Sequence, residues 1–131
     1  MTLLKQLLSF LLLVSISFIA NADANPDVWP YIKDRMFKDK VIEEVNFLKI
    51  DGPKRASSGA QVPINIKITQ KSGVEIKKLI LIIDSNPVQQ AATYHLTSNT
   101  QELDLSTRIR METDSFVRVV GEDSNGKLYM S

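Results

Sequence analysis

The fold of this chain is decided by the stretch Leu79-Ile80-Leu81-Ile82-Ile83-Asp84-Ser85-Asn86-Pro87. Five consecutive apolar residues, all Leu or Ile, are followed at once by a cluster of turn-forming residues. A run this short indicates a strand that is buried on both faces rather than a helix. The Asp, Ser and Asn side chains bond to their own backbone and the proline fixes φ, so the strand must end there. We expect the rest of the fold to be built around this strand.

Other segments alternate apolar and polar residues with the period of two that is typical of strands. In residues 62–69 the alternation has no exception. Strands are predicted at Val45–Ile50, Val62–Thr69, Ile76–Ile83, Ala91–Leu96, Leu103–Met111, Phe116–Val120 and Lys127–Met130. About seven short strands separated by turn residues predict an all-β fold, an immunoglobulin-like β-sandwich.

The segment before the first predicted strand is the one place where a helix is expected. Pro30 suits a first helical turn, and Trp29, Ile32, Met36 and Phe37 recur at the three- and four-residue spacing of one helix face. We predict a short amphipathic arm over residues 25–44 that packs its aromatic residues on the sandwich. The alternative is that this apolar stripe docks a partner. The sandwich itself is predicted to span residues 45–131.

The first 22 residues have the layout of a secretory signal peptide. Lys5 precedes an apolar stretch, Leu7–Ala20, and small residues follow in the pattern Ala-x-Ala. Cleavage is expected after Ala22 or Ala24. The alternative, a retained membrane anchor, is disfavoured because the apolar stretch is shorter than the ~20 residues that span a bilayer. We therefore expect an exported protein with no membrane contact after cleavage.

Composition excludes several classes of protein and of site. The formal net charge is only +1, so nothing points to nucleic acid or to an anionic membrane as a partner. The sequence contains no cysteine, which excludes a lipoprotein anchor, a thiol nucleophile and stabilisation by disulfides. With no cysteine and a single histidine, a structural zinc site is excluded as well.

Few residues are candidates for chemistry. The only histidine, His95, falls on the outward face of a predicted strand, where a solvated or edge position is favoured over catalysis. Asp84 ends the buried strand, but beside Ser-Asn-Pro it is interpreted as a turn-former. Asp123, Asn125 and Gly126 superficially resemble a calcium loop whose other ligands are absent. They are interpreted as a hairpin turn in which both Asn125 and Gly126 have positive φ.

Three arginines, Arg108, Arg110 and Arg118, occupy outward positions on two strands that could be neighbours. Together they would suit an oxyanion such as a sulfur oxoacid. The alternative, which we favour, is a solvated face with cross-strand partners at Glu102 and Asp104. We assign no catalytic residue, cofactor or metal, and do not expect an enzyme.

Several stretches are similar to one known family. The strand ending in Asp84-Ser85-Asn86-Pro87, the Ala-rich residues 91–94, the Thr-Arg-Ile-Arg run at 107–110 and Gly-Lys-Leu-Tyr at 126–129 resemble the SoxY family in order and spacing. These are carrier proteins of periplasmic sulfur-compound oxidation, including oxidation of thiosulfate. The start of the mature chain, with Trp29, Ile32, Phe37 and Ile42, resembles the SoxYZ-like carriers associated with quinoprotein dehydrogenases.

The resemblance implies an immunoglobulin-like sandwich that associates with a SoxZ-like β-sandwich partner and meets periplasmic redox enzymes. It also implies a carrier cysteine in a mobile Gly-Gly-Cys tail, which would let one thiolate visit several enzyme sites. This sequence ends at Ser131 without that tail and without any cysteine, so no carrier residue is transferred. We also expect the closing strand of the sandwich to be missing, which would leave an unpaired edge.

Three functional hypotheses follow. The first is the scaffold of a SoxY-like carrier whose reading frame is truncated before the tail. The second is a cysteine-less periplasmic module that docks a SoxZ-like partner. The third is an enzyme acting through Asp84 or His95.

Overall fold

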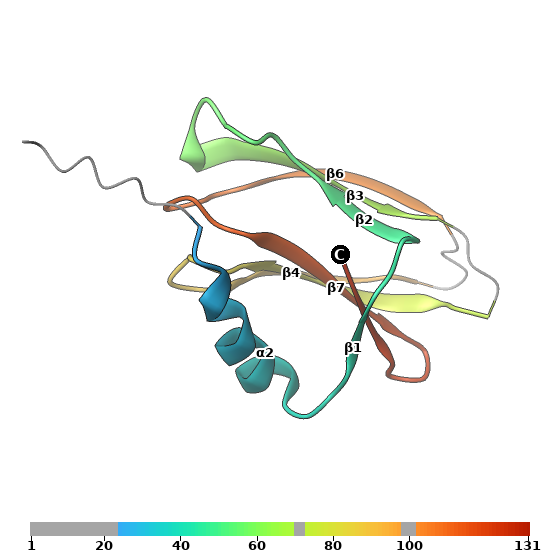
Figure 1. Cartoon of the computed structure of the whole chain (residues 1–131). Coiled ribbons are helices and arrows are strands. Elements are labelled where there is room, and N and C mark those ends of the chain that lie inside the picture. The colour runs from blue at the N-terminus through green and yellow to red at the C-terminus, as the bar shows by residue number, and fades with distance from the viewer. Residues whose placement is uncertain (1–23, 70–72, 98–101) are drawn as a thin grey trace, which may run out of the picture.

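The computed structural model describes residues 24–69, 73–97 and 102–131 (Figure 1). The predicted signal peptide lies outside these ranges. The elements in chain order are the 3₁₀ turn η1 (Pro26–Val28), helix α2 (Trp29–Phe37), β1 (Ile42–Glu44), β2 (Leu48–Asp51), the 3₁₀ turn η2 (Gly59–Gln61), β3 (Val62–Ile68), β4 (Ile76–Ile83), β5 (Gln90–His95), β6 (Leu103–Ile109), β7 (Val117–Asp123) and β8 (Leu128–Met130). In the described part of the chain, no helix has the length and apolar character needed to cross a membrane.

Two sheets pack face to face. One has the strand order β1-β8-β7-β4-β5 and the other the order β2-β3-β6. Figure 1 shows the smaller sheet above the larger one, with α2 on the far side of the larger sheet. The predicted all-β, immunoglobulin-like sandwich with a short N-terminal helix is confirmed, with eight strands in the described residues rather than about seven.

Strand β4 is buried on both faces, as its run of apolar residues predicts. Leu79, Leu81 and Ile83 point into the core between the sheets. Ile80 and Ile82 point the other way, into a second apolar cluster beneath α2. Because successive side chains of a strand alternate between faces, an unbroken apolar run requires cover on both sides. The sandwich supplies one cover and the helix supplies the other.

Helix α2 provides the second cover through the apolar side predicted for it. Ile32 and Phe37 are buried, and Trp29 and Met36 are partly buried against the same cluster. The cluster is completed by residues of the large sheet, namely Ile80, Ile82, Val120, Leu128 and Met130. The interpretation that the arm packs on the sandwich is therefore confirmed. The helix ends at Phe37, and Lys38 takes a positive φ of 53°.

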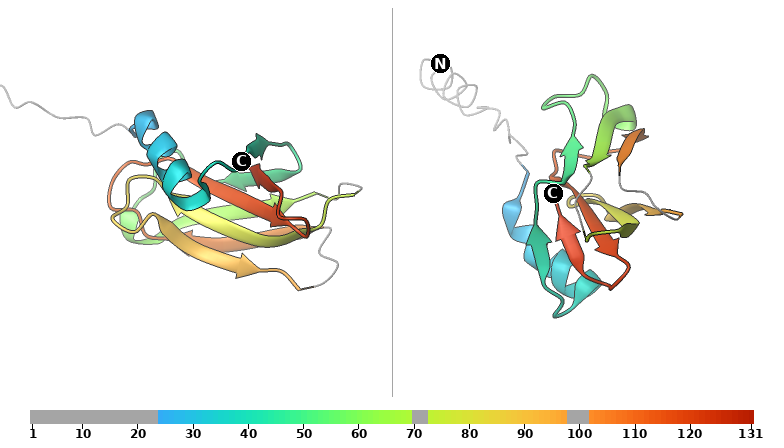
Figure 2. Two further views of the ribbon diagram at one scale, coloured as in Figure 1. Left: turned by 90° about the horizontal axis from the view of Figure 1, so that it is seen from below. Right: turned by 90° about the vertical axis from the view of Figure 1, so that its right-hand side faces the viewer.

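The rest of the arm differs from the prediction. Residues 42–44 form β1, which runs parallel to β8 in the register Ile42 to Leu128. Figure 2, right, shows β1 beside the C-terminal strand. Strand β8 therefore lies between β7 and β1, and the edge expected to be open is occupied. A three-residue strand paired with a segment at the other end of the sequence has no local pattern that could reveal it.

The β7–β8 hairpin also corrects a prediction. Gly126 has φ of +79°, but Asn125 does not have a positive φ. Asp123 and Lys127 close the loop, because the Asp123 N–H donates to the Lys127 carbonyl at 3.0 Å. The loop thus has three residues with the left-handed conformation only at the last one, a common alternative to the two-residue Asn-Gly turn.

Candidate functional site

The most strongly positioned charges belong to Asp84 and Arg118. Asp84 follows β4 and its side chain is 0% exposed, while the Arg118 side chain is 19% exposed. Arg118 donates three hydrogen bonds to the carboxylate, from Nε at 3.1 and 3.0 Å and from Nη2 at 2.9 Å. Its guanidinium also lies over the rings of Trp29, at 4.5 Å, and Phe116, at 5.3 Å. Through these contacts the Asp84–Arg118 pair links the end of β4, strand β7 and the start of helix α2.

This pair replaces the turn-forming role expected of Asp84. The turn after β4 is instead closed by backbone groups, with Asn86 N–H donating to the Ile83 carbonyl at 3.3 Å. Ser115 Oγ accepts from the Ser85 N–H at 2.9 Å. A carboxylate directly after a fully buried strand could have signalled an ion pair, since a buried charge requires a partner. Its charge is balanced by Arg118 inside the domain.

The three arginines do not form one oxyanion site. β6 and β7 belong to different sheets, so the two strands are not neighbours. Arg118 is held by Asp84, as described. Arg110 Nε contacts Glu112 Oε1 at 2.8 Å, and Arg108 Nη1 donates to Gln61 Oε1 at 3.3 Å. The hypothesis of a three-arginine site is therefore wrong.

The two remaining candidates have structural surroundings. His95 is exposed at the end of edge strand β5. Asp123 Oδ1 accepts from the N–H groups of Asn125 and Lys127, both at 2.9 Å, and its Oδ2 accepts from the Tyr129 hydroxyl at 3.0 Å. Both oxygens of Asp123 thus stabilise the hairpin, and in the described ranges no cluster of three or more His, Cys, Asp or Glu side chains is placed to hold a metal.

The Asp123–Tyr129 contact perturbs one titration. Tyr129 is 4% exposed. Burial raises the pKa of its hydroxyl above the usual 10.0, and the hydrogen bond to Asp123 raises it further, because both disfavour the phenolate. Tyr129 therefore remains a neutral hydrogen-bond donor across the ordinary pH range.

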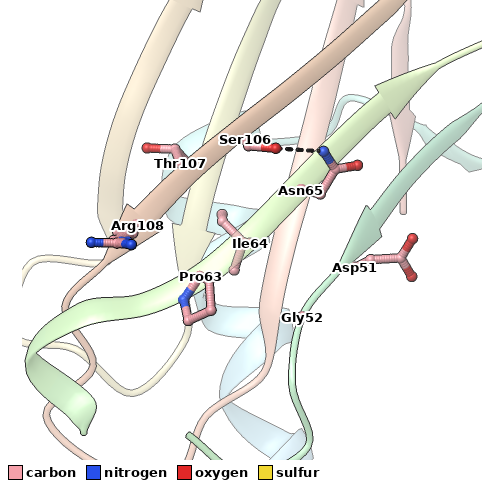
Figure 3. A pocket seen from close by; sticks show the side chains of 8 residues that line it. All are labelled: Asp51, Gly52, Pro63, Ile64, Asn65, Ser106, Thr107 and Arg108. Atoms are coloured by element: carbon pink, nitrogen blue, oxygen red, sulfur yellow. Dashed lines mark hydrogen bonds between the residues drawn. The ribbon is translucent and has the colours of Figure 1, made fainter.

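A shallow hollow of about 520 Å³ lies on the smaller sheet (Figure 3). Asp51, Asn65 and Ser106 form one cross-strand row there. Pro63 lies opposite Arg108 two positions along, in the next row on the same face of the sheet. Asn65 Nδ2 donates to Ser106 Oγ at 3.0 Å. The Oδ1 of the same amide is buried and has no hydrogen-bond partner in the described part of the chain. The hollow is thus flanked by an exposed carboxylate, Asp51, and an exposed guanidinium, Arg108.

Sequence reasoning identified Arg108 but missed the hollow, because Asp51 and Asn65 come from other strands. The cross-strand partners expected for the arginines also differ. Asp104 accepts from Asn65 Nδ2 at 2.6 Å and pairs with Lys67 at 3.7 Å. These contacts follow from the β3–β6 register, in which Lys67 lies opposite Asp104.

A family model described as "Sulfur oxidation protein SoxY" matches residues 33–131. This chain belongs to the SoxY family. The match covers most of α2 and every strand, so the SoxY-family region includes the whole sandwich. No curated protein sequence matches the chain significantly.

A solved structure shows that this SoxY-family chain has a known fold. The sulfur carrier protein SoxY from Chlorobium limicola f thiosulfatophilum is 22% identical and superposes with a TM-score of 0.64. The match covers 80% of this chain and 87% of the other. The stretches that suggested the family from sequence lie in β4, β5, β6 and the β7–β8 hairpin, inside the matched region.

Proposed function

We propose that this SoxY-family chain is the scaffold of a periplasmic carrier in sulfur-compound oxidation of the thiosulfate type. The observation that carries the proposal is the family match over residues 33–131. The relative of the same fold is itself a sulfur carrier protein. Since none of the 131 residues is a cysteine, they provide the folded domain and not the thiol that would hold sulfur.

The proposed partner is a SoxZ-like β-sandwich protein, and its docking surface is the hollow on the smaller sheet. Asp51 and Arg108 are both exposed at this hollow, so polar groups of a partner can reach them. Asp51 and Arg108 place opposite charges at either side of the hollow, which favours one orientation of a polar partner surface.

A docking role without catalysis is consistent with how the polar groups are used. The buried Asp84 is neutralised by Arg118, and His95 is exposed on an edge strand. We therefore propose that chemistry occurs on partner proteins such as periplasmic redox enzymes. The alternative within the same proposal is a cysteine-less module whose only task is to dock the SoxZ-like partner.

The test is co-expression of the tagged chain with a SoxZ-like protein, followed by purification and measurement of the mass of the complex. We expect a complex containing both chains, and failure to co-purify would overturn the proposed partnership. Arg108→Glu should weaken the complex about tenfold or more, because it reverses one charge of the hollow. Arg110→Glu is the matched control, since Arg110 lies near the end of the same strand outside the hollow. Equal effects of the two variants would refute the assigned surface but not the partnership.

Export is tested separately. The chain expressed with its first 22 residues should appear in the periplasmic fraction, and its N-terminal residue should be Asp23 or Asn25. Recovery of the uncleaved chain from the membrane fraction would contradict the proposed location.

A further inference from the structure

Strand β5 differs from the other edge strands of the sandwich in its charge. In the described residues the sheet edges are β1 and β5 in the larger sheet and β2 and β6 in the smaller one. Charged residues on the other three edges are Glu43 and Glu44 on β1, Lys49 and Asp51 on β2, and Asp104 and Arg108 on β6. The six residues of β5 include no Asp, Glu, Lys or Arg. Edge strands are normally protected by such charges, so β5 is open to pairing with another strand.

The free side of β5 carries main-chain groups in a defined pattern. The Leu96 N–H donates to the Lys77 carbonyl at 2.8 Å, and Tyr94 lies opposite Leu79 on β4. Hydrogen-bonding direction alternates along an antiparallel strand, so Tyr94 bonds inward to β4 while Thr93 and His95 direct their N–H and C=O groups outward. The bulge in the β4–β5 pairing lies between Leu81 and Ile82, toward the other end of β5. Residues 92–95 are therefore regular.

The side chains of this segment are also suited to pairing with themselves. Ala92, Tyr94 and Leu96 face the core and are only partly buried against it, which leaves apolar surface at this border of the sandwich. Thr93 and His95 are on the opposite face of the strand, where His95 is exposed. Figure 2, left, shows β5 in gold at the lower border of the larger sheet.

We propose that β5 binds a second copy of this chain by antiparallel pairing about a two-fold axis at Tyr94. In this register Thr93 lies opposite His95 of the second copy, and these two equivalent pairs supply about four main-chain hydrogen bonds. The two Tyr94 side chains face each other in a non-hydrogen-bonded pair, where aromatic side chains stabilise a sheet. Ala92 lies opposite Leu96, so a small side chain meets a large one. No like charges meet, since the strand has none.

This interface goes beyond the proposed function and does not depend on it. The hollow assigned to the SoxZ-like partner is on the smaller sheet, whereas β5 borders the larger sheet. Pairing through β5 joins two larger sheets edge to edge and leaves the hollow exposed. The two proposals can therefore fail separately.

The first experiment uses the absence of cysteine from the sequence. Tyr94→Cys introduces a single thiol at the two-fold axis. The Cβ atoms of two directly opposite residues in a non-hydrogen-bonded pair are about 4.5–5.5 Å apart. A small shift of the backbone brings them close enough for a disulfide. Under mild oxidation we expect most of this variant to form a covalent dimer. Ser106→Cys is the control, because Ser106 is exposed in the smaller sheet and should remain mostly monomeric. Equal cross-linking of both variants would overturn the assignment.

The second experiment removes the outward donor. Thr93→Pro lacks the backbone N–H and places its ring at the free edge, whereas Thr93→Val retains the N–H and serves as the control. Sedimentation of the unmodified chain over increasing concentration should show a monomer–dimer equilibrium, and Thr93→Pro should shift its midpoint at least about tenfold upward. Circular dichroism checks that the proline variant is folded.

Two results of the sedimentation would refute the proposal. One is an unmodified chain that remains monomeric at all concentrations. If Thr93→Pro then impairs binding of the SoxZ-like protein, the β5 edge is assigned to that partner instead. The other is a dimer whose midpoint is unchanged in the folded Thr93→Pro variant, since the copies would then meet through another surface.

Discussion

Replacing Arg118 with Met leaves a buried carboxylate without its counter-charge. Asp84 is 0% exposed in its side chain and accepts hydrogen bonds from both Nε and Nη2 of Arg118. Met is similar in length and apolar, so it still fills the space beneath Trp29, 4.5 Å from the guanidinium in the native chain. The variant therefore isolates the loss of the ion pair from the loss of packing.

The expected loss is large because only one partner is removed. Breaking a buried ion pair in this way costs about 3–5 kcal/mol of the free energy of unfolding. A domain of this size has about 5–15 kcal/mol in total, so the loss is a major fraction. The melting temperature should fall on the order of 12–25 °C. The double variant Asp84→Asn/Arg118→Met removes both charges and should lose less than Arg118→Met alone, because no buried charge remains unpaired.

Urea denaturation followed by circular dichroism measures these differences without relying on the fluorescence of Trp29, whose surroundings change. Arg110→Met is the matched control. The Arg110 pair with Glu112 is exposed, 72% and 48% in the two side chains, and should contribute less than about 1 kcal/mol. If Arg118→Met costs no more than Arg110→Met, or if the double variant is the least stable, the argument about the buried charge is wrong.

Two further predictions concern Tyr129 and Gly59. Since the folded pKa of Tyr129 is raised above 10.0, its contribution to stability is complete below about pH 10 and is lost as the pH rises further. Tyr129→Phe should lower the free energy of unfolding by about 1.5–3 kcal/mol near pH 7, because the hydrogen bond to Asp123 is lost. This difference from the unmodified chain should shrink above pH 10. Urea titrations in which the difference stays constant with pH would contradict the prediction. A Cβ on Gly59 would lie 2.6 Å from the Met111 carbonyl oxygen, so Gly59→Ala should lower the free energy of unfolding by about 1–3 kcal/mol. The control Gly52→Ala should lose under about 0.5 kcal/mol, because a Cβ there makes only ordinary contacts. Similar losses of the two variants in thermal melts would refute the clash.

The elements that depend on local pattern could be predicted from the sequence. The unbroken apolar run of β4 requires two covers, and α2 has the matching apolar side in Trp29, Ile32, Met36 and Phe37. The alternation in β3 fixed which of its residues face the core. Each of these patterns spans neighbouring residues and follows from the geometry of one strand or one helix.

Prediction failed where a feature joins distant parts of the chain. Asp84 and Arg118 are 34 residues apart, and nothing near either residue indicates the other. Whether the arginine-bearing strands are neighbours could not be read from the sequence, and β6 and β7 fold into different sheets. The hollow likewise combines Asp51 with residues of two other strands.

The sequence by itself determined the two-layer β architecture, the helix that covers it and the family to which it belongs, because periodicity, turn chemistry and short motifs are local. Only the tertiary structure decided that β1 closes the edge beside β8, that Asp84 is held by Arg118, and that β5 is an uncharged edge strand among the described residues. Strand order and register depend on the pairing of segments far apart in the chain. Many such pairings share the same local pattern, and packing of the whole domain selects one of them.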